Sequence, residues 1–338
     1  MKALFIGGTG TISSEISRLA PKMGWELYHL NRGNRKNEFT NVKQIQCDIR
    51  EDTPAVIRKK LEDAVGKGNC FDVIADFFAF VPAHIQKDID IFNGLCRQFM
   101  FISSASVYQK PLSSYLVTES TPLANPLWQY SRDKIACEEM LIANYRGSGF
   151  PITIVRPSHT YDERKVPLGV HGSNGSWQVL KRMIDGKPVI IHGDGTSLWT
   201  LTHSSDFAQA FIRLMGNLHT IGEAVHITSD ESVTWNQIYK VIADSLKVEL
   251  KAVHIASGFL DKCSQDHYDF KGSLLGDKAN SVVFDNTKLK RLVPEFRAKV
   301  RVDEGIPKTI ANVLANKELQ QEDPEFDAWC DSIIKMVQ

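Results

Sequence analysis

Short apolar runs alternate with longer amphipathic stretches along the first half of the chain. The first run and the last three are mostly apolar and bounded by turn residues, as in strands buried on both faces of a parallel sheet. The second and third runs are more polar. The runs are residues 3–6, 26–30, 42–46, 72–75, 99–102 and 152–155. Between the first two, apolar side chains recur at helical spacing, at Ile12, Ile16, Leu19 and Ala20. This strand–helix–strand order predicts an α/β fold with a doubly wound parallel sheet, the Rossmann architecture.

The pattern changes after residue 156, where the alternation weakens and the loops lengthen. Asp206 is placed to cap a helix. The apolar stripe of that helix is Phe207, Ala210, Phe211 and Leu214. Further helices are predicted over residues 235–246 and 304–315, whereas residues 257–281 are irregular and are expected to be mostly loop.

The change of pattern divides the chain of 338 residues into two unequal parts. We expect a Rossmann domain over residues 1–156, completed by parts of residues 200–230. The remainder, residues 157–338, is expected to form a smaller, mixed α/β part that binds the substrate. A chain of this length can bury a core in each part.

Composition and charge narrow the classes of protein that fit this fold. Forty basic side chains balance forty acidic ones, which argues against nucleic acid or an anionic membrane as a partner. The six cysteines are scattered without a CxxC pair, so neither a disulfide framework nor a metal site is expected. No apolar run approaches the roughly 18–20 residues of a membrane span, and the first strand starts too early for a signal peptide. We therefore expect a cytoplasmic protein.

A glycine-rich turn, GGTGTIS at residues 7–13, connects the first strand to the first helix. Glycines allow a sharp turn and a close approach to a pyrophosphate, and the unpaired N–H groups at the start of a helix attract its charge. The third fingerprint position needs a small residue; Ser13 is small but is not glycine. The turn predicts a dinucleotide-binding site. Its candidate residues are Gly7, Thr9, Gly10, Thr11 and Ile12.

The turn after the second strand bears on the choice of cofactor. Sites for NAD usually place Asp or Glu here for the ribose 2′-hydroxyl, whereas an arginine accommodates the 2′-phosphate of NADP. This chain has no acid at the position and instead carries Asn31, Arg32 and Arg35. The sequence favours NADP and leaves NAD open, with a solvated basic turn as the alternative interpretation.

A tyrosine and a lysine lie four residues apart, at Tyr130 and Lys134. On a helix both side chains share one face, and a nearby ammonium favours the phenolate and lowers the pKa of tyrosine. Upstream, the strand at residues 99–102 delivers the serines of SSASVY, residues 103–108, to the edge where open α/β sheets bind ligands. A hydroxyl there can donate to a substrate carbonyl oxygen.

Together these motifs, in this order, resemble the extended short-chain dehydrogenases/reductases, and more narrowly the NAD-dependent epimerase/dehydratase family. The resemblance runs to about residue 315. It implies that Tyr130 is the catalytic acid/base, that Ser104 polarises the substrate, and that Lys134 holds the nicotinamide ribose. It also implies further cofactor contacts after the third, fourth and sixth strands. These are Asp48, Ile49, Phe78 and Pro157.

Departures from the family pattern are informative. Nucleotide-sugar epimerases usually hold the diphosphate with two arginines, but this chain has Ser197-Leu198-Trp199 and Leu274-Leu275 in those regions. A nucleotide diphosphate would lose its bidentate partners. The segment DFFA at residues 76–79 also lacks the usual alanine-rich turn. These features resemble a subgroup that contains chloroplast stem-loop RNA-binding proteins, in which the Tyr–Lys pair is degraded. Here the pair is intact, which favours an enzyme.

The sequence therefore predicts an NAD(P)-dependent oxidoreductase that moves a hydride at a hydroxyl-bearing carbon of a sugar-like or other small carbonyl substrate. Epimerisation, dehydration and simple reduction stay open. The alternative is an RNA- or protein-binding module on a retained Rossmann fold, based on a basic run that also fits a solvated face. That run is Lys288, Lys290, Arg291, Arg297, Lys299 and Arg301. By family resemblance, a homodimer would form through helices near residues 83–97 and 130–145.

Overall fold

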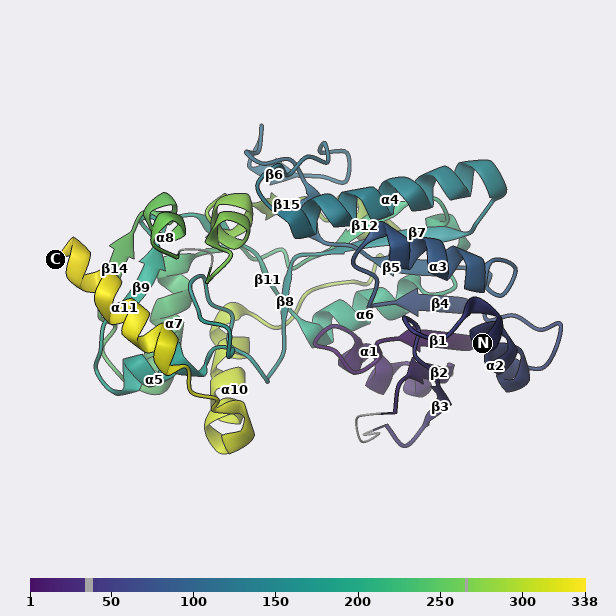
Figure 1. The fold of residues 1–338 in the computed structure, drawn as a ribbon, viewed down its shortest axis with the longest axis horizontal. Coiled ribbons are helices and arrows are strands. Elements are labelled where there is room, and N and C mark those ends of the chain that lie inside the picture. Colours follow the sequence, from purple (N-terminus) through teal and green to yellow (C-terminus); the bar gives the residue numbers. More distant parts are fainter. Residues whose placement is uncertain (34–38, 265–266) are drawn as a thin grey trace.

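The computed structural model describes residues 1–33, 39–264 and 267–338. Its centre is a parallel sheet of seven strands in the order β12-β7-β5-β4-β1-β2-β3 (Figure 1). The strands are β1 (Lys2–Ile6), β2 (Glu26–Asn31), β3 (Val42–Gln46), β4 (Val73–Asp76), β5 (Phe99–Ile102), β7 (Ile152–Pro157) and β12 (Ala224–Ile227). All neighbouring pairs run parallel. The doubly wound Rossmann prediction is confirmed, and β12 comes from the later segment of the chain.

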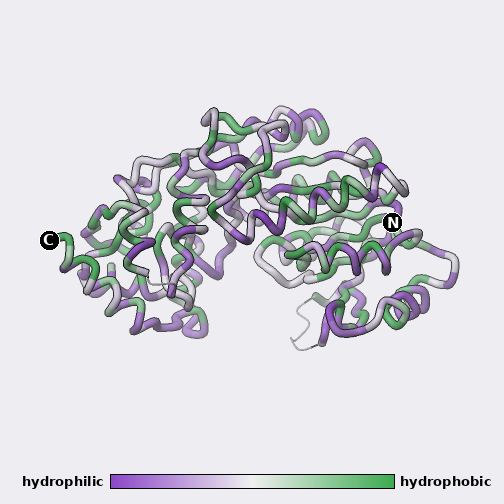
Figure 2. Tube along the Cα trace, turned by 45° about the horizontal axis from the view of Figure 1, so that its top comes forward, coloured by the Kyte–Doolittle hydropathy of each residue, from purple (hydrophilic) through white to green (hydrophobic). Residues whose placement is uncertain are grey.

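Helices cover both faces of this sheet because alternate strand residues point to opposite sides. On β1, Leu4 and Ile6 join one core while Ala3 and Phe5 join the other. The helices of the first face are α2 (Pro54–Val65), α3 (Pro82–Phe92) and α4 (Gln129–Ser148). Those of the second face are α1 (Ser13–Leu19), α6 (Ser204–Leu214) and α9 (Thr287–Leu292). In Figure 2 the sheet strands are largely hydrophobic, while the covering helices alternate between hydrophobic and hydrophilic residues.

A third core lies in the second part of the chain, which extends away from the sheet (Figure 1). Its helices are α5 (Trp177–Ile184), α7 (Trp235–Leu246), α8 (Ser257–Ser264), α10 (Val302–Ala315) and α11 (Pro324–Val337). Four two-stranded pairs accompany them: β6 (Leu116–Val117) with β15 (Val283–Phe284), β8 (His159–Tyr161) with β11 (Leu201–His203), β9 (Val189–His192) with β14 (Ala252–Ile255), and β10 (Leu198–Trp199) with β13 (Val233–Thr234). Short 3-10 turns are η1 (Pro21–Met23), η2 (Ala105–Val107), η3 (Leu218–Thr220) and η5 (Lys317–Leu319).

The predicted cap of α6 is wrong. The helix begins at Ser204, and the His203 ring nitrogen accepts the Ser205 N–H at 3.3 Å. Asp206 lies inside the first turn, where its carboxylate accepts the backbone N–H groups of Lys299 at 2.9 Å and Val300 at 2.8 Å. A long-range partner thus uses the carboxylate that local sequence assigned to a cap.

The prediction that residues 257–281 are mostly loop is also wrong. The segment contains α8 and a π-helix, η4 (Lys271–Lys278). Leu260 and Leu274 are fully buried in the third core, and the Trp329 indole donates to the Cys263 carbonyl at 3.2 Å. Contacts with distant residues stabilise helical turns that the weak local periodicity did not indicate.

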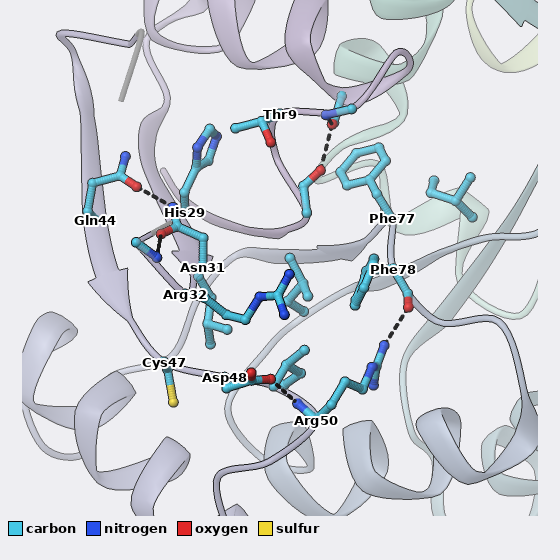
Figure 3. A pocket seen from close by; sticks show the side chains of 18 of the residues that line it. Thr9, His29, Asn31, Arg32, Gln44, Cys47, Asp48, Arg50, Phe77 and Phe78 are labelled. Atoms are coloured by element: carbon cyan, nitrogen blue, oxygen red, sulfur yellow. Dashed lines mark hydrogen bonds between the residues drawn. The ribbon is translucent and has the colours of Figure 1, made fainter. Parts of the chain in front are cut away.

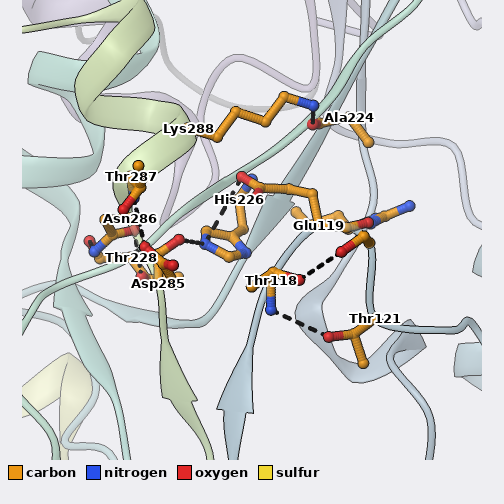
Figure 4. A network of polar contacts seen from close by, with 12 residues as sticks. Thr118, Glu119, Thr121, Ala224, His226, Thr228, Asp285, Asn286, Thr287 and Lys288 are labelled. Carbon is orange, nitrogen blue, oxygen red and sulfur yellow. Dashed lines mark hydrogen bonds and ion pairs between the residues drawn. The ribbon is translucent and has the colours of Figure 1, made fainter.

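A polar network fastens the edge strand β12 to the segments that follow β6 and β15 (Figure 4). The His226 backbone N–H donates to Glu119 at 3.2 Å, and its ring contacts the Asp285 carbonyl at 2.8 Å. One residue on, Asn286 exchanges hydrogen bonds with Thr228 through side chain and backbone. Burial lowers the pKa of His226, so this network holds a neutral imidazole.

Among the described residues, every helix is too short or too polar to cross a bilayer.

Candidate active site

The glycine-rich turn is shaped by close contacts that exclude larger residues. Gly7 has a φ of +78°, and a Cβ on Gly8 would lie 2.4 Å from the His29 Nε2 atom. The Ser13 hydroxyl donates to the Gly7 carbonyl at 2.7 Å and accepts the Gly10 N–H at 2.9 Å. Ser13 therefore closes the turn itself, which explains the departure from glycine at this position. The open backbone cradle fits the close approach of a pyrophosphate.

This turn forms one wall of a pocket of about 600 Å³ at the carboxyl ends of β1, β2 and β4 (Figure 3); we call it the glycine-turn pocket. Ten of the predicted cofactor residues line it: Gly7, Thr9, Gly10, Thr11, Ile12, Asn31, Arg32, Asp48, Ile49 and Phe78. Arg35 lies outside the described residues. Lining residues that the sequence analysis missed include His29, Gln44 and Phe77. These residues match no sequence motif for cofactor binding, and only the fold brings them close to the glycine-rich turn.

The two side chains at the end of β2 differ: that of Asn31 is hydrogen-bonded, whereas that of Arg32 has no partner among the described residues. Asn31 accepts the Gly33 N–H at 2.9 Å and donates to the Gln44 side chain at 2.5 Å. Arg32 is exposed, and its guanidinium has no hydrogen bond or ion pair within the described part of the chain. Figure 3 shows this side chain extending across the pocket toward Phe78. Arg32 is thus available to an anionic group.

The opposite wall is held by Arg50. Asp48 accepts the Arg50 N–H at 2.9 Å, which fixes the turn after β3. The Arg50 guanidinium donates to the Phe78 carbonyl and lies 5.3 Å from the centre of the Phe78 ring. Phe78 is 41% exposed, so the arginine leaves the ring facing the pocket. Sequence reasoning found Asp48 and Phe78 but not the residue that connects them.

Two buried carboxyl groups lie behind this wall. Asp76 and Asp88 are fully buried, 3.8 and 4.0 Å respectively from Arg50 nitrogens. Burial raises the pKa of Asp88 well above its usual range, and the neighbouring Asp76 charge raises it further. Asp76 also accepts the Phe78 N–H at 2.5 Å. The DFFA segment at residues 76–79 is therefore held in place by the two buried carboxyl groups and Arg50.

A second pocket of about 440 Å³, the tyrosine pocket, opens at the carboxyl ends of β5 and β7. It shares Ile12, Phe77, Phe80 and Ile102 with the glycine-turn pocket, so the two pockets adjoin. The predicted residues that line it are Ser104, Tyr130, Lys134 and Pro157. The structure thus places all three predicted catalytic residues around one cavity.

Tyr130 lies beside a chain of hydroxyl groups. Burial raises the pKa of Tyr130 to about 12, and the neighbouring Ser104 hydroxyl acts in the opposite direction. The Ser104 hydroxyl lies 2.9 Å from that of Ser106, to which Ser131 donates at 2.8 Å. The net shift is opposite to the one expected from the nearby Lys134 cation, because desolvation of the phenolate outweighs the favourable contacts.

Lys134 is nearly buried beneath Tyr130, at 2% exposure. Its ammonium donates to the carbonyls of Ala79 at 2.6 Å and Ile102 at 2.7 Å. It lies 5.8 Å from the centre of the Tyr130 ring. Burial lowers the pKa of Lys134 to about 8. The ammonium therefore joins the ends of β4 and β5 at the junction of the two pockets.

The helix that carries Tyr130 and Lys134 is fixed against the sheet by a buried ion pair. Glu138, one turn beyond Lys134, is fully buried. Arg156 of β7 donates to both of its oxygens, at 3.0 and 2.6 Å, and Ser103 of the strand-end motif donates to it at 2.5 Å. Arg156, which directly precedes Pro157, thus sets the position of α4 relative to β5 and β7.

The remaining wall of the tyrosine pocket comes from residues that the sequence analysis did not single out for this site. They are Lys110, Trp128, His159, His171, Asp277 and Lys278. Of the residues found where phosphate-binding arginines are expected, Trp199 lines the pocket, whereas Leu274 is fully buried in the core. The sequence offered one signal that Lys110 belongs to this site, namely its position two residues after the SSASVY segment. It offered no such signal for Asp277 and Lys278, which lie on the π-helix.

The basic run that motivated the RNA-binding alternative is largely engaged within the chain. Lys288 pairs with Glu223, Lys290 with Asp230, and Arg301 with Asp303. Arg297 donates to the carbonyls of Pro294 and Phe296. These contacts match the interpretation of a solvated helix face and loop.

Comparisons with known proteins bear on the family of this chain. A family model described as NAD dependent epimerase/dehydratase family matches residues 3–228. The 2'-dehydrokanamycin reductase of Streptomyces kanamyceticus is 26% identical over 189 residues, 56% of this chain and 52% of the reductase. The chloroplast stem-loop binding protein of 41 kDa b of Arabidopsis thaliana is 24% identical over 249 residues, 72% of this chain and 62% of that protein. The chain thus spans about half the length of the first relative and less than two thirds of the second.

A solved structure shows the same fold over nearly the whole chain. The UDP-glucuronic acid 4-epimerase from Bacillus cereus, in complex with NAD, superposes with a TM-score of 0.71 at 18% identity. The match covers 97% of this chain and 99% of that one. The resemblance to extended short-chain dehydrogenases/reductases is thereby confirmed. The chain belongs to the NAD dependent epimerase/dehydratase family.

Proposed function

We propose that this protein is an NAD(P)-dependent oxidoreductase that acts on a hydroxyl-bearing carbon of a sugar-like substrate, with Tyr130 as the acid/base. The observation that carries the proposal is that Ser104, Tyr130 and Lys134 line one pocket, which adjoins the glycine-turn pocket, with the Lys134 ammonium 5.8 Å from the centre of the Tyr130 ring. The sugar-modifying relatives support the substrate class. The reductase named for 2'-dehydrokanamycin and the UDP-glucuronic acid epimerase are both named for sugar derivatives.

The residues of the glycine-turn pocket fit a dinucleotide. The backbone between Gly7 and Ser13 would hold the pyrophosphate, since side chains larger than hydrogen are excluded at Gly8. Phe78 offers an exposed ring, and Asp48 and Ile49 border the same space. Lys134, at the junction with the tyrosine pocket, would contact the nicotinamide ribose. When bound, the nicotinamide supplies hydride transfer.

Tyr130 would move the proton of the substrate hydroxyl. Near pH 7 the phenol is protonated, and its raised pKa makes loss of the proton less favourable, so proton transfer requires stabilisation of the phenolate. Ser104 reaches the same phenol and can donate to the substrate oxygen as charge develops on it. Lys134 stabilises negative charge on Tyr130 when the proton leaves. These roles apply whether the net outcome is reduction, dehydration or epimerisation.

We further propose that NADP is preferred over NAD. Arg32 lines the glycine-turn pocket with its guanidinium free within the described residues, and no carboxylate occupies the end of β2. A 2′-phosphate would receive a charge-assisted hydrogen bond there. The NAD complex of the epimerase belongs to a protein of 18% identity, which leaves the choice in this chain to its own residues.

Cofactor titration and a hydride-transfer assay test both proposals. Calorimetry with NADP and NAD should give binding of both, with NADP the tighter. Incubation of the reduced cofactor with keto sugars should then give loss of nicotinamide absorbance that depends on Tyr130. Tighter binding of NAD would refute the cofactor preference. Failure to bind either dinucleotide would refute the enzyme and favour the binding-module alternative.

A further inference from the structure

The tyrosine pocket contains a buried ammonium that forms no ion pair or hydrogen bond with the described residues. Lys110 lines the pocket and is only 4% exposed. Its Nζ atom has no hydrogen bond or ion pair within the described part of the chain, although its backbone N–H donates to Ala124 at 2.8 Å. A buried cation is costly unless it is paired or hydrogen-bonded. Burial lowers the pKa of Lys110, while the nearby Asp277 charge raises it.

A second ammonium comes from the π-helix. Lys278 ends the π-helix η4 and also lines the pocket. Its backbone carbonyl accepts from Trp235 at 3.1 Å and Ser197 at 3.3 Å and contacts the His192 ring at 3.1 Å. These contacts fix the backbone, yet the Lys278 ammonium has no partner among the described residues. π-helical turns occur often at functional sites, which matches a lysine held in place over a cavity.

The charges around the pocket do not cancel. Asp277 is the one carboxylate among the described lining residues, and it forms no ion pair within 4.0 Å with Lys110 or Lys278. Burial lowers the pKa values of His159 and His171 to about 3, so both rings are neutral near pH 7. Two free lysines therefore face one carboxylate, in addition to Lys134. An incoming anion would meet a net positive wall.

We propose that Lys110 and Lys278 form an anion subsite of the tyrosine pocket, which selects a sugar-like substrate bearing a compact anion, a carboxylate or a phosphate monoester. This inference rests on the proposed function, because it assumes that the substrate occupies the tyrosine pocket. A lysine is a compact point charge and suits a small anion that needs no bidentate fork. A cavity of about 440 Å³ lies in the range typical of small-molecule sites.

The test is a binding comparison on the full chain, with and without NADP. The probes are glucuronate, glucose 6-phosphate, glucose and the cationic glucosamine, measured by calorimetry at constant ionic strength. At least one anionic sugar should bind roughly ten- to a hundredfold more tightly than glucose, the effect of a charged hydrogen bond, and glucosamine should bind most weakly. Comparison of the two anionic sugars identifies the anion. Equal or tighter binding of glucose or glucosamine, or no binding of either anionic sugar, overturns the proposal.

Substitutions locate the effect. Lys110→Met and Lys278→Met should each weaken the anionic sugar roughly ten- to a hundredfold and leave glucose almost unchanged. Lys110→Arg, which keeps the charge, should retain most of the affinity, and it guards against a folding defect in the methionine variant. Lys22→Met is the matched control, because Lys22 is exposed and remote from the pocket. Wild-type affinity in both methionine variants overturns the subsite.

The two proposals fail differently. Binding of NADP reports on the proposed function and should persist in Lys278→Met, because Lys278 does not line the glycine-turn pocket. If the anionic sugar binds without selectivity while NADP still binds, only the anion subsite is refuted. If NADP does not bind but Lys110 and Lys278 still govern binding of an anionic sugar, the enzyme is refuted and the anion site stands.

Discussion

The two adjoining pockets are built in different ways. Most of the glycine-turn pocket comes from residues 6–51, and two of its polar side chains are hydrogen-bonded to residues of the same segment. Ser17 holds His29, and Asn31 holds Gln44. The tyrosine pocket draws on residues from Ile12 to Phe284, and several of its charges have no partner in the described chain.

This difference shows which recognition problem each pocket solves. A dinucleotide presents the same pyrophosphate in every enzyme that uses it, so a local backbone turn suffices. A substrate is particular to the enzyme, so its groups must be met by side chains brought from several elements. A buried charge without a partner in the protein is tolerated where a bound ligand supplies that partner. We therefore expect changes at Tyr130 to affect chemistry and changes around β1 and β2 to affect cofactor binding.

The largest expected effect breaks the chemistry and leaves the cofactor pocket intact. Tyr130→Phe removes the proton-transferring hydroxyl, so turnover should fall by roughly 10²–10⁴-fold while NADP affinity stays near that of the wild type. Ser104→Ala should lose less, because the proton path through Tyr130 survives. Steady-state rates at saturating cofactor provide the measurement.

Tyr145→Phe is the matched control, since Tyr145 is on the same helix and 36% exposed at its surface. Normal turnover and an unchanged pH profile in Tyr130→Phe would place the chemistry elsewhere.

The next largest effect concerns the affinity of the glycine-turn pocket for its cofactor. Arg32→Asp removes the free guanidinium and adds a like charge near the 2′-phosphate. Binding of NADP should weaken by about 1.5–3 kcal/mol or more, the scale of a charged hydrogen bond. Binding of NAD, which lacks that phosphate, should be almost unaffected. Calorimetric titration of both cofactors measures the difference, and equal losses for NAD and NADP would contradict this role.

Substitution of glycine tests how tightly the local turn is built. Gly8→Ala places a methyl group against the His29 ring, at 2.4 Å from Nε2, whereas at Gly10 the nearest atom is 3.4 Å away. Overpacking of this kind costs about 1–3 kcal/mol. Thermal melting should therefore show a clear loss for Gly8→Ala and little for Gly10→Ala. Equal stability of the two variants would show that the His29 ring moves aside freely.

The smallest effect concerns the junction between the pockets. Burial lowers the pKa of Lys134 from 10.5 to about 8. Between those values the unfolded chain binds more protons than the folded one, so this residue adds stability as the pH rises from 8 toward 10.5. The melting temperature of Lys134→Met relative to the wild type should thus fall by roughly 1–3 °C between pH 7 and pH 10. Lys22→Met should track the wild type throughout, and parallel curves for Lys134→Met would contradict the shift.

Local signals in the sequence were sufficient to predict the strands of the parallel sheet and the glycine-rich turn. The strands β1 to β5 and β7 fall at the predicted positions, because apolar runs between turn residues can be buried in few other ways. The helix α7 (Trp235–Leu246) matches its prediction at both ends. Glycines and serines of the turn after β1 act within a few residues of one another, so their roles can be recognised from spacing alone. The Tyr130–Lys134 pair has the same advantage, since one helical turn sets their proximity.

The tertiary structure decided what depends on distant partners. Asp206 caps nothing locally because Lys299 and Val300 reach its carboxylate from the other end of the chain. The pKa of Tyr130 rises despite the neighbouring lysine because the fold removes the phenol from water. Lys110 and Lys278 share a cavity although 168 residues separate them, and no periodicity connects a loop lysine with a π-helix. Spacing along a chain fixes contacts within a few turns, but desolvation and the meeting of remote charges exist only after the elements pack.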